Sequence, residues 1–125
     1  MNQNNEVDTI LRELAAVRVK VMPDEYDIHD AVFRCLTEAG LCPEHEYKLG
    51  PRCRIDFKVG RTGLEIKKGR PVRSALITQL GRYLSSDELD RVIVITQQNV
   101  PLPASICGKP VIACPLNRLW GVALP

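Results

Sequence analysis

A chain of 125 residues with 45% hydrophobic content can bury one core but not two, so we expect a single domain over residues 1–125. No apolar run reaches the length of a membrane span, and the first twenty residues are polar, which predicts a cytoplasmic protein without a signal peptide. The five cysteines show no paired spacing, so we expect reduced thiols and no disulfide. Cys42 and His45 have the spacing of zinc ligands, but Cys35 and Cys53 fall on apolar faces, so we expect core packing and no zinc site.

The net charge of +2 is unevenly distributed along the chain. Residues 48–82 hold ten Lys and Arg residues and two acids, a net +8, so the rest of the chain carries −6. Such a basic block is typical of proteins that bind nucleic acid, although a well-solvated surface explains the same count.

Helical periodicity predicts a first helix within residues 1–20 and a second from Glu25 to Gly40, after the break at Pro23. These precede a core that we place at 24–116, with a tail at 117–125. In chain order the core then contains strand-like runs at 44–49, 53–59 and 62–68, a helix over 70–86, a β-branched strand at 91–97, a proline-rich loop and a strand near 109–116.

The hairpin at 53–68 carries an acid in the middle of each strand. With Gly60 first in a two-residue turn, Val59 pairs with Thr62, and Asp56 falls opposite Glu65. Strand alternation sends Ile55, Phe57 and Val59 to one face of the sheet, and Asp56, Glu65 and Lys67 to the other.

Carboxylates that face each other repel unless a cation lies between them, and a hard divalent ion such as Mg²⁺ suits oxygen ligands. Lys67 would then bring an ammonium group to the edge of the ion, where an attacking water would lie. The alternative is a solvated hairpin face whose acids pair with Arg54 and Lys67. On the next helix, Gln79 and Tyr83 fall in the apolar stripe, which turns them toward the sheet unless Gln79 lies at the stripe's edge.

These residues resemble a known family. Asp56, followed after eight residues by Glu65-Ile66-Lys67 and then by Gln79-Leu80-Gly81-Arg82-Tyr83 on the next helix, is similar to the PD-(D/E)XK nuclease superfamily, and the Gln-x-x-x-Tyr element resembles its RecB-like branch. Ile55 stands where the family name has proline. The resemblance implies an α/β fold with a restriction-endonuclease-like core, in which helices flank a mixed β-sheet of a three-stranded antiparallel meander, a crossover helix and a parallel strand.

By this resemblance, Asp56 and Glu65 hold Mg²⁺, or Mn²⁺ as a substitute, together with the carbonyl of Ile66. Lys67 positions the attacking water, while Gln79 and Tyr83 orient Lys67 and contact the DNA backbone. Many relatives also carry an acid on the first core helix that reaches the metal. Here Glu25 could take that place or serve the helix dipole, and Glu46 is a weaker candidate. The remaining candidates for DNA contact are Arg54, Lys58, Lys68, Arg70, Arg73 and Arg82.

The implied reaction is hydrolysis of DNA phosphodiester bonds by a small nuclease, of a type often carried by phage and mobile elements. Endonuclease and exonuclease action both stay open, as do a homodimer and a partner protein that supplies substrate specificity. The alternative is a nuclease-like DNA-binding or accessory subunit with little turnover alone. The two cysteines after the Gln/Tyr helix are too few for an iron-sulfur cluster, and we expect His29 to be a helix-surface residue.

Overall fold

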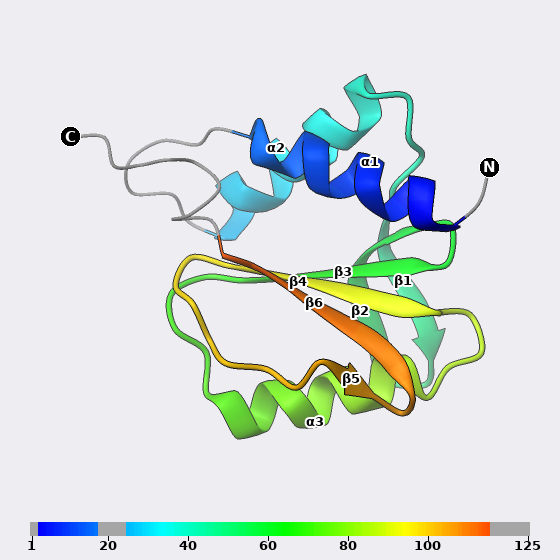
Figure 1. Ribbon diagram of the computed structural model, residues 1–125, viewed down its shortest axis with the longest axis vertical. Helices are drawn as coiled ribbons and strands as arrows, with labels where there is room; N and C mark the ends of the chain where they lie inside the picture. Colours follow the sequence, from blue (N-terminus) through cyan, green and yellow to red (C-terminus); the bar gives the residue numbers. More distant parts are fainter. Residues whose placement is uncertain (1–2, 18–24, 116–125) are drawn as a thin grey trace.

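The computed structural model describes residues 3–17 and 25–115, which form an α/β arrangement with helices on both faces of one mixed sheet (Figure 1). The strand order across the sheet is β1-β2-β3-β4-β6-β5. Within the described residues, no helix has the length and apolar character needed to cross a membrane. The elements are α1 (Gln3–Ala15), α2 (Glu25–Glu38), β1 (Glu44–Gly50), β2 (Cys53–Val59), β3 (Thr62–Lys67), α3 (Arg73–Leu84), β4 (Arg91–Thr96), β5 (Ser105–Ile106) and β6 (Lys109–Pro115).

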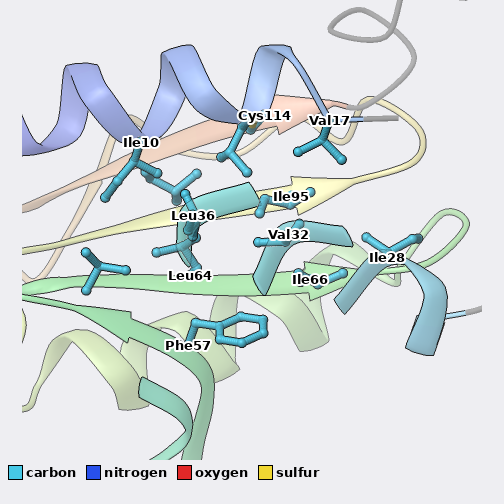
Figure 2. Packing of buried hydrophobic residues seen from close by; sticks show 13 residues of the cluster. Ile10, Val17, Ile28, Val32, Leu36, Phe57, Leu64, Ile66, Ile95 and Cys114 are labelled. Carbon is cyan, nitrogen blue, oxygen red and sulfur yellow. The ribbon is translucent and has the colours of Figure 1, made fainter. Parts of the chain in front are cut away.

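The sheet has two packed faces. Helices α1 and α2 cover one face, and α3 lies along the other (Figure 1). The cluster on the first face joins Ile10 of α1 and Val32 of α2 to Phe57 and Ile66 of the sheet (Figure 2). The cluster on the second face is built from Ile55, Leu76, Leu80, Tyr83, Leu84, Leu89, Val92, Val94 and Val111. All six residues of β4 are buried, as expected for a strand covered on both sides.

The order of the elements confirms the predicted meander and crossover. Strands β1, β2 and β3 pair antiparallel, α3 crosses over, and β4 pairs parallel to β3. The last long strand, β6, also pairs parallel to β4. The sequence missed β5, which has only two residues and follows the proline-rich loop. Helix α3 begins at Arg73 instead of residue 70, because Pro71 disfavours helical geometry at Arg70 and because Val72 is still extended. The predicted tail at 117–125 lies outside the described residues.

The tip of the β2–β3 hairpin is anchored at two places. Gly60 has φ +60°, and a Cβ at this position would come within 2.4 Å of the Glu6 carboxylate of α1. Arg61 accepts a hydrogen bond from the backbone N–H of Asp90 at 2.8 Å and donates from Nε to the Asp90 carboxylate at 2.9 Å. The hairpin that carries the two candidate acids is therefore fixed against both α1 and the loop that precedes β4.

Candidate functional site

The site begins where β2 and β3 stop pairing. Their ladder runs from the predicted Val59–Thr62 pair to the pair formed by Phe57 and Leu64. In a regular antiparallel ladder, the N–H of Ile66 would next donate to the carbonyl of residue 55. Instead, Oδ2 of Asp56 accepts that N–H at 2.7 Å. The Asp56 carboxylate therefore lies in the gap between the two strands.

The same irregularity overturns the predicted alternation along β2. Ile55 packs with the α3 cluster, whereas Phe57 and Val59 pack with the α1–α2 cluster, so the expectation that these three share a face is wrong. Ile55 can turn to the α3 side because Gly63 has no side chain: a Cβ there would come within 2.5 Å of Ile55 Cδ1. At Asp56 the inward-pointing side chains of β2 therefore change from one face of the sheet to the other.

Strand β1 is distorted at the same level. His45 pairs with Phe57 and Tyr47 with Ile55, and Glu46 between them has a left-handed φ of +50°. Such a conformation costs energy for a residue with a side chain and is common next to functional sites. The backbone therefore departs from regular β geometry on both strands around Asp56.

Glu65 is the most buried acid of the site, with 3% of its surface exposed. Its Oε1 accepts hydrogen bonds from the Tyr83 hydroxyl at 3.1 Å and, at 3.4 Å, from the backbone N–H of Asp56. Its Oε2 lies 3.2 Å from Lys67 Nζ. Burial and the neighbouring charge of Asp56 raise the pKa of Glu65 to about 7, although Lys67 opposes them. One lysine therefore does not compensate two neighbouring carboxylates.

Tyr83 ties α3 to the site. Its ring is buried, and its hydroxyl also lies 3.2 Å from the carbonyl oxygen of Arg54. Burial, followed by the charge of Glu65, raises the pKa of the Tyr83 hydroxyl well above its ordinary value, so it stays a hydrogen-bond donor. The predicted inward position of Tyr83 is confirmed, and the structure gives it a direct contact with Glu65.

Lys67 and Gln79 line one hollow of about 420 Å³ on the α3 side of the sheet. Arg82 lines the same hollow, together with apolar residues from the start of α3. Lys67 is partly exposed there, with 28% of its side chain accessible, while its amine reaches Glu65. Gln79 is half-buried, so its position within the hollow does not distinguish an inward-facing amide from one at the edge of the helix stripe.

His29 is a site residue that the sequence reasoning missed. Its side chain is only 16% exposed, and Nε2 lies 3.6 Å from Asp56 Oδ2. Its ring also packs against Phe57, with centroids 5.7 Å apart. The expectation of a helix-surface residue is therefore wrong. The available signal was its place directly after Ile28, at the edge of the buried stripe of α2.

The fit of a metal ion depends on the donors that approach one another. Among residues 3–17 and 25–115, no three His, Cys, Asp or Glu side chains form a ready metal-binding group. Asp56 and Glu65 nonetheless offer oxygen donors, and Mg²⁺ is commonly held by one or two carboxylates while waters and phosphate complete its shell. The donor chemistry therefore fits Mg²⁺. The side chain of Glu25, the other predicted ligand, lies outside what the structure describes, and Glu46 is exposed.

The predicted DNA-contacting bases surround this region unevenly. Lys68 and Arg70 are exposed in the loop that follows Lys67. Arg73 donates from Nε to the carbonyl of Pro101 at 2.7 Å, and Lys58 Nζ sits 4.8 Å from the centroid of the Tyr47 ring. Arg54 and Arg82 are exposed. Of these predicted DNA-contacting residues, Arg82 lines the Lys67 hollow.

Comparison with known protein families, curated proteins and solved structures found no match for this chain. Glu65 contacts Tyr83 of α3, Lys67 and the backbone N–H of Asp56. The Asp56 carboxylate itself lies 3.6 Å from His29 of α2, so the expectation that Asp56 shares one face of the sheet with Glu65 and Lys67 is not confirmed. At this gap between strands, the two carboxylates can bind a cation. The amine can orient a water molecule, and the buried phenol holds one of the acids in place.

Proposed function

We propose that the protein is a Mg²⁺-dependent nuclease of the PD-(D/E)XK type that hydrolyses phosphodiester bonds of DNA. The main support is the buried carboxylate of Glu65, held beside Asp56 with a pKa of about 7. Two acids in this position cost stability by themselves, and a divalent cation between them would remove that cost. The antiparallel meander, the crossover helix α3 and the parallel strand β4 are what a restriction-endonuclease-like core requires.

Each side chain then has a defined task. Asp56 and Glu65 would hold the ion, and the resemblance to the nuclease family implies the carbonyl of Ile66 as a further oxygen donor. When bound, the ion would supply Lewis-acid chemistry, polarising the scissile phosphate and stabilising the leaving oxygen. Tyr83 fixes the orientation of Glu65 through its hydroxyl.

Lys67 would act on the nucleophile. Its amine is anchored by Glu65 at one side and faces the hollow that Gln79 lines, so it can donate a hydrogen bond to a water beside the phosphate. Gln79 would hold the lysine and the DNA backbone in place. The exposed bases Lys68, Arg70 and Arg82 would bind phosphates on either side of the cleaved bond, a contact that positions DNA without reading its sequence.

Cleavage assays with a matched control test this proposal. The protein is incubated with plasmid, linear, single-stranded and branched DNA in Mg²⁺, Mn²⁺ or EDTA, beside Lys67→Ala and Lys48→Ala. Lys48 is an exposed base on β1 that does not line the hollow. We expect metal-dependent cleavage that falls about 100-fold or more in Lys67→Ala and is retained in Lys48→Ala. Cleavage that persists in EDTA, or that Lys67→Ala leaves unchanged, contradicts the proposal.

One observation favours a second candidate. Because no three ligating side chains converge among the described residues, the chain could instead be a DNA-binding or accessory subunit that needs a partner protein for turnover. The same assay separates the two: DNA binding without cleavage on every substrate and in every metal supports the subunit. Restoration of cleavage by a second protein would show that the partner supplies the missing part.

A further inference from the structure

A second concave surface lies on the α2 side of Asp56. It is a cavity of about 460 Å³ between α2, the first residues of β1 and Phe57 of β2. Its wall is aromatic: the His45 ring stacks on Phe57 at 4.9 Å between centroids, and the Phe33 ring lies nearly parallel to Phe57 at 6.1 Å. Tyr26 and Phe33 line the cavity with 75% and 40% of their surfaces exposed. Two large rings are thus kept in contact with solvent at a preformed hollow.

This cavity adjoins the candidate catalytic site. Phe57 follows Asp56 directly in β2, and His29 both lines the cavity and lies 3.6 Å from Asp56 Oδ2. Any polymer whose phosphate reaches Asp56 would therefore have its neighbouring unit within reach of the aromatic wall.

The charge of the lining indicates what that unit is. The described lining residues include the acids Asp30 and Glu46 but no Lys or Arg, so a phosphate is disfavoured there. Asp30 pairs with Arg34 of the same helix, whereas Glu46 lines the cavity as an exposed residue with a left-handed backbone. A flat π surface together with a carboxylate suits a ring that carries hydrogen-bond donors. Nucleobases with exocyclic amino groups have this character, and carboxylates accept hydrogen bonds from such groups.

We propose that this cavity binds an unpaired nucleobase adjacent to the scissile phosphate, so that the preferred substrate is DNA with a single-stranded extension, flap or gap. The inference deepens the proposed function and rests on it for the position of the phosphate. A base inside an intact duplex is stacked and paired and does not reach the cavity. Cytosine, adenine and guanine, which carry an amino group, bind there better than thymine.

Equilibrium binding in EDTA tests the cavity apart from catalysis. The probe is 2-aminopurine, whose fluorescence is quenched when it stacks. It is placed at the terminal position of a blunt duplex and in the extension of a duplex with a three-nucleotide extension. The variants are Tyr26→Ala/Phe33→Ala, the ring-retaining Tyr26→Phe, and Thr37→Ala as a control on the exposed part of α2. Circular dichroism checks that each variant is folded.

We expect the extended duplex to bind at least fivefold more tightly than the blunt one, with quenching of the extended 2-aminopurine, since stacking of one base on an aromatic residue accounts for a change of that size. The double variant loses both effects, while Tyr26→Phe and Thr37→Ala keep them. Any of three results overturns the inference: equal affinity for the two duplexes, no quenching, or a double variant that behaves as the wild type. The surface would then be assigned to the binding of a protein partner.

The two proposals fail separately. If quenching and the preference for the extension are present but no DNA is cleaved in Mg²⁺ or Mn²⁺, the nuclease proposal fails and the base-binding cavity stands. If blunt duplex is cleaved with loss of activity in Lys67→Ala, yet the extended base is neither quenched nor preferred, the nuclease stands and the cavity proposal fails.

Discussion

The pKa of Glu65 makes the stability of the metal-free protein depend on pH. Burial and the charge of Asp56 raise this pKa from 4.5 to about 7, and with 3% of the residue exposed, little solvent screening reduces the effect. The difference corresponds to about 3 kcal/mol between the protonation states. Removal of this one carboxylate should therefore change the pH profile of unfolding measurably.

The sign follows from proton linkage. The folded protein binds the Glu65 proton more tightly than the unfolded chain, so the stabilisation is complete below pH 4.5 and is lost as the pH rises through about 7. Between pH 5.5 and 8 the loss amounts to about 2 kcal/mol. Glu65→Gln has no such carboxylate, so its free energy of unfolding should exceed that of the wild type increasingly as the pH rises.

Urea unfolding in EDTA at pH 5.5, 7 and 8 measures this difference, with Glu44→Gln as a control at an exposed acid of β1. At pH 8, Mg²⁺ at 100 times its dissociation constant should add about 2.7 kcal/mol to the wild type and clearly less to Glu65→Gln. A wild type and a Glu65→Gln variant with parallel pH profiles, or with equal stabilisation by Mg²⁺, would refute the reasoning that two carboxylates share an uncompensated site.

Three further outcomes follow from the packing. Tyr83→Phe removes the buried hydroxyl that donates to Glu65 and should cost about 1 to 3 kcal/mol of unfolding free energy in urea titrations, and an unchanged midpoint would contradict that contact. Gly63→Ala would place a Cβ within 2.5 Å of Ile55 Cδ1, so we expect a loss of about 1 to 3 kcal/mol, read as a lower melting temperature; a neutral effect would mean that β2 does not turn there. Cys114 is 3% exposed and burial raises its pKa to about 12, so it should react with thiol reagents only after denaturation, and rapid labelling of the native protein would contradict this burial.

Local chemistry made much of the fold predictable. The Gly60-Arg61 turn determined the hairpin register, because only a residue free to adopt positive φ allows so short a connection. Gly40, with φ +87°, follows the end of α2 at Glu38 as its sequence position indicated. The β-branched run of β4 was recognisable because a strand covered on both faces carries no polar alternation.

The details of the site were less predictable, because they depend on departures from regular geometry. Period-two alternation assumes an unbroken ladder, and Asp56 breaks it by accepting the N–H of Ile66 with its side chain. Nothing in the residues around Ile55 signals that it turns to the α3 side, since the space it uses is left by Gly63 on the neighbouring strand. The approach of His29 to Asp56 likewise requires the packing of α2 on the sheet.

The Tyr83 hydroxyl has one proton and two acceptors within reach, the Glu65 carboxylate and the Arg54 carbonyl. If a ligand draws Glu65 away, the Tyr83 hydroxyl can still donate to the carbonyl of Arg54, so no buried donor is left without an acceptor. Because the Tyr83 hydroxyl has this second acceptor, Glu65 can change its hydrogen-bond partner at a small cost in free energy, while α3 and the sheet keep their positions.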